Sequence, residues 1–499
     1  MNETVVETTC GKVRGSDQGA VSVWKGIPFA QPPVGELRFR PPQPPQAWAR
    51  VRDATEYGMV APQAVLREGS PLGNRLTPGE ESEDCLYLNV WSPRADGRRR
   101  PVLVWLHGGA FTMGSGSTPL YDGTSFAQQG DVVAVTLNYR LGALGFLYLD
   151  ELLGEQYSGS GNNGLLDQIA ALQWVHDNIA AFGGDPDRVT IFGESAGAMS
   201  VGTLLAMPAA KGLFRQAILQ SGAASSVRSR ESAARVTREF LDELGLQESE
   251  ASALATLPLA NLMAAQTRIL GKQSALLAFG PVVDGTSLPR PPLEAVASGA
   301  ARDIPLLIGT NHDEMRLFNA ANPTPPDERV LRHFFGDEAD RALATYNASR
   351  PQASPADIWS AMQTDQVFRM PAIRLAELQA KQGAPVWMYR FDWPSPAFGG
   401  RLGAAHALEL AFVWNNIAKA AMRPLLGDEP PQELARRMHE AWIAFARTGH
   451  PGTPDLPPWP PYDSEQRATM LFNISCEVVN DPDAAERRVW ENRYKKDAV

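Results

Sequence analysis

A short β-branched apolar run, residues 189–192, ends abruptly in Gly193-Glu194-Ser195-Ala196-Gly197, and residues that favour a helix follow. This Gly-x-Ser-x-Gly pattern predicts a strand that turns so sharply into a helix that the serine is held at the bend. Glycine is expected on both sides because a Cβ there would collide with the neighbouring strand or helix. The helix after the serine would point backbone N–H groups toward an anion forming at this place. The motif arises by chance in roughly one of five chains of this length. A catalytic role for the serine therefore depends on finding the residues that would act with it.

Four apolar runs bounded by turn residues predict buried parallel strands. They are residues 101–106, 131–137, 188–192 and 304–308. Residues 165–182 carry apolar side chains at helical spacing and are followed by Gly-Gly-Asp-Pro, as expected for a helix end. Strand, helix and strand in this order imply right-handed crossovers and a mostly parallel sheet with helices on both faces, the α/β class.

The rest of the chain is expected to complete one unit around this sheet. The opening segment is typical of short alternating strands, and residues 223–270 and 328–382 have mostly helical patterns. We expect these helices above the carboxyl edge of the sheet, where open α/β sheets bind ligands. The Pro-rich residues 451–462 are expected to form a surface loop, and no repeat or linker divides the chain. The sequence therefore predicts a single domain over residues 1–499.

Composition narrows the class of protein. The 499 residues are 44% hydrophobic and 20% charged, which is ordinary for a globular enzyme with a large core. A net charge of −10 without a long basic run argues against a nucleic-acid partner. The first residues lack a signal-peptide pattern, no apolar run reaches membrane-spanning length, and three cysteines do not suggest a disulfide framework. We therefore expect a cytoplasmic protein without a membrane partner.

A serine hydroxyl becomes a nucleophile when a base takes its proton and a third group orients that base. In folds with this elbow the order along the chain is serine, then carboxylate, then histidine. His406 follows Gly403-Ala404-Ala405 and precedes a helical pattern, so it lies on a small-residue loop from which a base can project. Five other histidines fit less well. His107 and His176 precede the serine, and the settings of His333, His439 and His450 are typical of solvated or loop side chains.

The carboxylate is expected after another core strand. Residues 304–308 lead into the loop Gly309-Thr310-Asn311-His312-Asp313-Glu314, which offers two acids. The spacing favours neither Asp313 nor Glu314 as the acid that orients the base. The acid that does not take this role would be a solvated or hydrogen-bonded loop residue. His312 is too close to either acid in the sequence to be the base.

A second glycine-rich motif follows an earlier strand. Residues 102–106 end in His107-Gly108-Gly109-Ala110-Phe111, which fits a loop whose backbone N–H groups hold the oxyanion of a tetrahedral intermediate. Glycine lets the donors reach the substrate oxygen without an intervening side chain. The alternative, an ordinary Gly-Gly turn, is less favoured directly after a strand.

Several long, separately placed motifs resemble the type-B carboxylesterases, the family of bacterial p-nitrobenzyl esterases and animal cholinesterases. The resemblance covers nearly the whole length. Its motifs are residues 26–30, 33–39, 83–91, 138–142, 192–197, 220–222, 283–285 and 459–460. It implies an α/β-hydrolase fold: a large, mostly parallel central sheet flanked by helices, with helical insertions over the active site.

The resemblance also implies roles for particular residues. It implies Ser195 as nucleophile, Glu314 as acid and His406 as base. The implied oxyanion donors are the backbone N–H groups of Gly109, Ala110 and Ala196, and the implied supporting residues near the histidine are Glu194 and Ser221. No metal or organic cofactor is implied.

Three departures from the family pattern bear on function. Met315 stands where the family usually has glycine after the acid. Cys85 matches a cysteine that pairs in secreted members, yet its partner position is Ala61. Residues 61–85 contain no aromatic side chain, so a choline site of the cholinesterase kind is not expected.

These observations predict a serine carboxylesterase that hydrolyses short-to-medium acyl or aryl esters through an acyl-enzyme, as a monomer or weak homo-oligomer. One alternative is a carbamate or amide hydrolase with the same triad. Another is a non-catalytic binding protein, because the fold has adhesion relatives.

Overall fold

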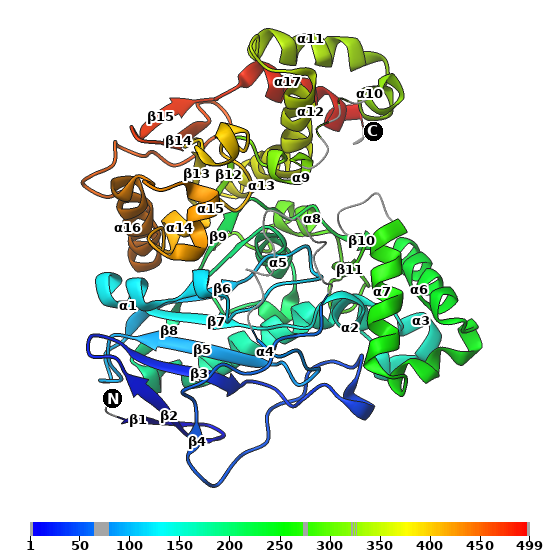
Figure 1. The fold of residues 1–499 in the computed structure, drawn as a ribbon, viewed down its shortest axis with the longest axis vertical. Helices are drawn as coiled ribbons and strands as arrows, with labels where there is room; N and C mark the ends of the chain where they lie inside the picture. Colours follow the sequence, from blue (N-terminus) through cyan, green and yellow to red (C-terminus); the bar gives the residue numbers. More distant parts are fainter. Residues whose placement is uncertain are drawn as a thin grey trace.

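The computed structural model describes residues 3–63, 79–272, 278–320, 323, 325 and 327–496. Within them, a 13-stranded sheet runs through the molecule in the order β1-β2-β3-β5-β7-β6-β8-β9-β12-β13-β14-β15, with β4 paired to β2 (Figure 1). The strands are β1 (Glu3–Thr8), β2 (Gly11–Asp17), β3 (Ser22–Pro28), β4 (Arg52–Asp53), β5 (Tyr87–Ser92), β6 (Arg100–Leu106), β7 (Val133–Leu137), β8 (Gly184–Glu194), β9 (Gln216–Gln220), β12 (Leu306–Asn311), β13 (Val386–Phe391), β14 (Ala468–Phe472) and β15 (Glu477–Asn480). A separate small sheet pairs β10 (Arg228–Ser229) with β11 (Val282–Val283).

The strands from β7 to β14 are parallel, and antiparallel strands stand at both ends of the sheet. All four predicted strands are present as β6, β7, β8 and β12. Strand β7 begins at Val133, because Asp131 takes a left-handed φ of 45° at the end of the preceding helix. Strand β12 begins at Leu306, directly after Pro305, which has no N–H to donate to a neighbour.

Successive side chains of β6 point to opposite faces of the sheet and belong to two different hydrophobic clusters. Val102, Val104 and Leu106 belong to one buried cluster, whereas Leu103 and Trp105 belong to the other. The first cluster is covered by α4 (Asn163–Asn178), α5 (Ala196–Leu204) and α13 (Met370–Lys381). The second is covered by α1 (Thr124–Gly130), α14 (Leu410–Val413) and α16 (Gln432–Thr448). The predicted α/β arrangement with helices on both faces is therefore confirmed.

Further helices account for the predicted helical stretches. The first stretch forms α6 (Arg230–Leu244), a 3-10 helix η8 (Glu248–Ala255) and α7 (Leu259–Lys272). The second forms α10 (Glu328–Phe335), α11 (Ala339–Ser349), α12 (Pro355–Thr364), the π-helical turn η10 (Asp365–Arg369) and α13. Helices α10 to α12 lie near the C-terminal α17 (Ala484–Lys496) at the top of Figure 1, and α6 and α7 lie at its right. The short helices are α2 (Gly142–Phe146), α3 (Asp150–Leu153), α8 (Pro292–Ala297), α9 (Arg316–Asn319) and α15 (Arg423–Leu426).

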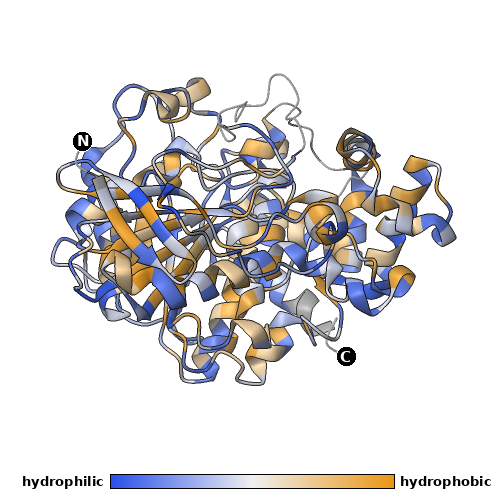
Figure 2. Cartoon of the chain, turned by 90° about the horizontal axis from the view of Figure 1, so that it is seen from below, coloured by the Kyte–Doolittle hydropathy of each residue, from blue (hydrophilic) through white to orange (hydrophobic). Residues whose placement is uncertain are grey.

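Many helices carry both hydrophobic and hydrophilic segments (Figure 2), and α16 buries Leu434, Met438 and Trp442 on one side while Glu433 is exposed. The expectation of a solvated His439 is wrong for this reason. His439 lies fully buried on the inner face of α16, with Nδ1 2.8 Å from the Val413 carbonyl oxygen and Nε2 3.1 Å from Ser125 Oγ. Burial lowers the pKa of His439, so the ring stays neutral. No helix among the described residues has the length and apolar character needed to cross a membrane.

Candidate active site

The Gly-x-Ser-x-Gly motif forms the predicted sharp turn. Strand β8 ends at Glu194 and α5 begins at Ala196, with Ser195 between them at φ 56° and ψ −124°. This left-handed conformation is strained for a residue with a side chain and persists only where the surroundings enforce it. A Cβ at Gly193 would lie 2.6 Å from the carbonyl carbon of Gly197, and a Cβ at Gly197 would lie 2.0 Å from the Leu106 oxygen. The steric reason for both glycines is thus confirmed.

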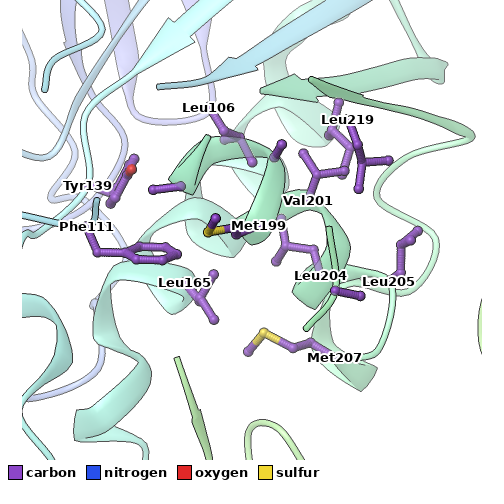
Figure 3. Close-up of a cluster of buried hydrophobic side chains, with 14 of the residues drawn as sticks. Leu106, Phe111, Tyr139, Leu165, Met199, Val201, Leu204, Leu205, Met207 and Leu219 are labelled. Carbon is purple, nitrogen blue, oxygen red and sulfur yellow. The ribbon is translucent and has the colours of Figure 1, made fainter. Parts of the chain in front are cut away.

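Helix α5 is buried along its whole length and holds the elbow rigidly. In Figure 3, Met199, Val201 and Leu204 of α5 lie among side chains of neighbouring elements, including Leu106 and Leu219. Because close-packed side chains resist displacement, the position of Ser195 is set by the core rather than by a surface loop.

His406 meets Glu314 in the interior. The imidazole Nδ1 lies 2.6 Å from Glu314 Oε2, and the other carboxylate oxygen accepts the Asn311 backbone N–H at 2.7 Å. Since a carboxylate can only accept, this contact places a proton on Nδ1 of the ring. Both side chains are buried. Of the two acids that the sequence left open, the structure brings Glu314 to the histidine.

Asp313 has a different role, because it holds the loop that carries His406. Its backbone N–H donates to the Ala404 carbonyl at 2.9 Å, and its Oδ2 accepts the Ala404 N–H at 3.0 Å. Burial opposes the charge of this carboxylate, but a hydrogen bond from His312 and the charge of Arg316 hold its pKa below the usual range. Asp313 is therefore an ionised side chain that joins the two loops of the site.

Asp313→Ala is expected to lower kcat about tenfold, because a small misplacement of the predicted base His406 is costly, and to lower the free energy of unfolding by about 1–3 kcal/mol. Asp313→Asn should stay near wild type, since its amide oxygen still accepts from Ala404. Ester kinetics and thermal unfolding check both. Asp463→Ala is a matched control, because Asp463 also accepts backbone N–H groups but on an exposed turn. Wild-type kcat in Asp313→Ala would contradict this role.

A second carboxylate flanks the histidine on its other side. His406 Nε2 lies 3.0 Å from Glu194 Oε1, and both side chains are buried. Burial by itself would lower the pKa of His406, but the charges of Glu194 and Glu314 outweigh it and raise this pKa well above the ordinary value. The ring therefore holds its second proton to a higher pH than a free histidine does. Glu194, predicted as a supporting residue, is in contact with the His406 ring.

A third buried glutamate, Glu409, was not predicted from the sequence. Its Oε1 accepts from Gln220 Nε2 at 3.2 Å and its Oε2 from Asn311 Nδ2 at 2.6 Å. Burial, together with the charges of Glu194 and Glu314, raises the pKa of Glu409 to about 8. An acid inside the apolar run that follows the candidate base was the signal that could have revealed it.

The second glycine-rich motif lies directly against the elbow. Gly109 and Ala110 take left-handed φ angles of 112° and 53°. A Cβ at Gly108 would lie 2.8 Å from Glu194 Oε2 and 3.1 Å from Ser195 Cβ. The loop that carries the two predicted donors is therefore packed onto the Ser195 turn, and Ala196 provides the first N–H of α5.

Two predicted contacts are not made in this structure. In the part of the chain that is described, the Ser195 hydroxyl has no hydrogen bond, and His406 Nε2 faces Glu194. Such contacts are often long without substrate and tighten in the complex, so the serine–histidine contact stays a prediction. Ser221 has a left-handed φ of 52°, and its buried hydroxyl has no partner among the described residues. Its supporting role also stays a prediction.

Two phenylalanines line the histidine ring and were not found from the sequence. The ring centroids of Phe368 and Phe318 lie 4.8 Å and 5.1 Å from that of His406. Phe368 comes from the π-helical turn η10 and is buried, whereas Phe318 is 37% exposed. Apolar rings therefore adjoin the His406 imidazole.

The departures from the family pattern leave this geometry intact. Met315 has helical angles, φ −74° and ψ −10°, so no glycine is needed after Glu314. Cys85 is a buried free cysteine. Most of the segment in which a choline-binding tryptophan was not expected lies outside the described residues.

Comparison with known proteins agrees with the fold. The model of the carboxylesterase family matches residues 2–490. The chain is 45% identical to a para-nitrobenzyl esterase of Bacillus subtilis (strain 168), over 98% of each chain. It is 38% identical to a phenmedipham hydrolase of Pseudarthrobacter oxydans, over 96% of this chain and 97% of that protein.

Solved structures give the same result. A carboxylesterase of Geobacillus stearothermophilus superimposes with a TM-score of 0.89 at 46% identity, covering 98% of this chain and 100% of that one. A p-nitrobenzyl (PNB) esterase superimposes with a TM-score of 0.85 at 43% identity and the same coverage. The chain therefore belongs to the carboxylesterase family, with an α/β-hydrolase fold and the activity of a carboxylic ester hydrolase.

Proposed function

We propose that this carboxylesterase works through an acyl-enzyme formed on Ser195, with His406 as general base and Glu314 as its orienting acid. The observation that carries the proposal is the buried contact of 2.6 Å between His406 Nδ1 and Glu314 beside the serine elbow. A proton fixed on Nδ1 leaves Nε2 to take the Ser195 proton once that ring position is free.

The steps follow from this arrangement. Ser195 Oγ attacks the ester carbonyl carbon while His406 Nε2 takes its proton, and the carbonyl oxygen becomes an oxyanion. The N–H groups of Gly109, Ala110 and Ala196 bind that oxyanion, each donor contributing about 2.7–4 kcal/mol to the transition state. The bond to the leaving oxygen breaks as His406 returns the proton to it. Water then repeats the sequence on the acyl-enzyme, releases the acid and restores Ser195.

We propose uncharged short-to-medium acyl or aryl esters as substrates. The exposed Phe318 beside His406 gives an apolar surface where the leaving group would lie. The test is a series of p-nitrophenyl esters from acetate to laurate, measured as kcat/KM. Turnover that is highest among the shorter chains and requires Ser195 is expected, whereas preference for laurate, or for choline esters over neutral ones, would overturn this substrate class.

A second candidate activity is suggested by the similarity to a phenmedipham hydrolase. The same residues could attack the carbonyl of a carbamate or an amide. Phenmedipham and an ester, carbamate and amide with the same leaving group should be compared by kcat/KM. We expect the ester to have the highest kcat/KM of the matched series. A higher kcat/KM for the carbamate or the amide would make that class of substrate the preferred one.

Glu194→Gln is expected to shift the pH dependence of kcat/KM to lower pH. His406 acts as a base only when Nε2 carries no proton, so activity rises with pH through the pKa of His406. That pKa is raised by Glu194 and Glu314, and removal of one anion lowers it. The measurement is a pH–rate profile, with exposed Glu56→Gln as control. A pH–rate profile of Glu194→Gln whose acid limb is unchanged, or is shifted to higher pH, would contradict the electrostatic role of Glu194.

The remaining proposals concern the whole protein. We propose a single catalytic domain, residues 1–499, that works in the cytoplasm as a monomer or weak homo-oligomer. Neither a cofactor nor a nucleic-acid or membrane partner is expected. The continuous sheet and the net charge of −10 support these expectations. Light scattering of the purified protein and activity in the presence of a chelator test the assembly and the cofactor expectation.

A further inference from the structure

The loop that follows β6 has an unusual backbone: the N–H groups of Thr112 and Met113 both donate to the Gly109 carbonyl oxygen at 3.0 Å, and several residues of the turn lie at positive φ. Besides Gly109 and Ala110, Phe111 and Gly114 take positive φ angles, 59° and 112°. A run of left-handed residues costs free energy and persists only when other groups determine it. Contacts from outside this turn therefore help to keep its N–H groups in one direction before a substrate binds.

Gln63, distant in sequence, binds this loop with its side-chain amide. Gln63 Oε1 accepts the Gly114 N–H at 2.9 Å, and Gln63 Nε2 donates to the Gly114 carbonyl at 3.3 Å and to the Ala61 carbonyl at 2.9 Å. The side chain is only 5% exposed. One amide thus satisfies both backbone groups of Gly114, as a neighbouring strand would.

Gly114 in turn is packed against the start of the loop. A Cβ at Gly114 would lie 2.4 Å from His107 Nδ1 and 2.5 Å from the Gly108 carbonyl oxygen. His107 is buried and stacked on Tyr139, and its Nδ1 lies 2.8 Å from that same Gly108 oxygen. Because a carbonyl only accepts, Nδ1 carries the proton and donates it. Burial lowers the pKa of His107 to about 4, which keeps the ring neutral in this form.

The Gly108 carbonyl and the Gly109 N–H belong to the same peptide group. A peptide is planar and trans, so its C=O and N–H point in opposite directions. A hydrogen bond that fixes the Gly108 oxygen therefore also fixes the direction of the Gly109 N–H. This is one of the donors assigned to the oxyanion.

We propose that Gln63 is a positioning residue for the oxyanion hole, which holds Gly114 against His107 and thereby aims the Gly109 N–H. The inference rests on the proposed function, in which that N–H binds the oxyanion. Gln63 itself does not touch the reacting atoms. Its loss should weaken binding of the tetrahedral state much more than binding of the planar ester.

The test compares Gln63→Met, which keeps the volume without the amide, and Gln63→Asn, which keeps the amide on a shorter side chain. Gln379→Met is the matched control: Gln379 is also buried and donates to two backbone carbonyls, those of Ala301 and Ile304, but on α13. Readouts are kcat and KM for p-nitrophenyl butyrate, Ki for an alkyl trifluoromethyl ketone and Tm. The ketone forms a hemiketal oxyanion on serine and so reports on the oxyanion hole.

We expect Gln63→Met to lower kcat about tenfold or more, as for partial loss of an oxyanion donor, with KM little changed and Ki of the ketone raised by the same factor. Gln63→Asn should show the same pattern more weakly. Gln379→Met should lower Tm and leave kcat and Ki unchanged. Wild-type kcat and Ki in both Gln63 variants, or a rise in KM alone, would overturn the inference. Failure of the unmutated protein to hydrolyse the ester and bind the ketone would instead overturn the proposed function.

Discussion

Ser195→Ala is expected to lower kcat for p-nitrophenyl acetate by a factor of about 10⁶, the loss typical for a serine nucleophile. Without the hydroxyl no acyl-enzyme forms, and the remaining turnover comes from the oxyanion donors and binding alone. The fold should persist, because alanine can take the same strained angles and removes only one oxygen from a packed turn. Steady-state rates, with the free energy of unfolding measured in parallel, check this prediction.

Ser200→Ala provides the matched control. Ser200 lies further along α5, is also buried and accepts a hydrogen bond from Gln168 Nε2 at 3.1 Å. Its loss should cost some stability and leave kcat nearly unchanged. Activity in Ser195→Ala above about one hundredth of wild type would mean that chemistry proceeds without this hydroxyl.

Glu314→Gln is expected to lower kcat by about 10⁴ with little change in KM, as in other triads whose acid becomes an amide. The reason lies in the two hydrogen bonds of the carboxylate. The Asn311 N–H donates to Oε1, so the amide oxygen of glutamine takes that place and its NH₂ group faces His406 Nδ1. A donor there favours the ring with its proton on Nε2, and such a ring cannot accept the Ser195 proton.

Asp313→Asn separates this effect from general damage to the loop. Both substitutions replace one carboxylate by an amide at adjacent positions, and of the two acids only Glu314 contacts the His406 ring. A Glu314→Gln variant within about tenfold of wild type, together with an inactive Asp313→Asn, would assign the acid to Asp313.

The core strands and the elbow could be predicted from the sequence because their signals are local. The apolar run of β6 is followed by a glycine-rich motif, and β8 leads directly into the Gly-x-Ser-x-Gly turn. The clash that excludes a side chain at Gly197 involves Leu106 of the next strand, and parallel pairing of β6 with β8 brings these segments together. Periodicity and turn residues were enough for these elements.

The choice between Asp313 and Glu314 could not be made from spacing. The two acids are adjacent, and their roles depend on the loop at 404–406, which comes about ninety positions later. Only the fold decides that Asp313 meets Ala404 while Glu314 meets His406. The family resemblance supplied Glu314, but the residues alone did not.

The burial of His439 and Glu409 also could not be predicted from the neighbouring residues in the sequence. His439 is next to a charged residue in the sequence, yet the packing of α16 against α1 and α14 buries it. Glu409 is buried between Gln220 and Asn311, which come from strands β9 and β12. Burial of a polar side chain is decided by distant segments, and short-range patterns do not contain that information.

Labelling by an organophosphate shows whether Ser195 is the nucleophile without any substitution at that position. The protein is treated with one equivalent of the reagent, residual activity is followed, and the modified peptide is identified by mass spectrometry. The proposed mechanism predicts one adduct per chain on Ser195, loss of activity in proportion to labelling, and very slow labelling of His406→Ala. Full inhibition with the adduct on another residue, or retained activity in protein fully labelled at Ser195, would contradict it.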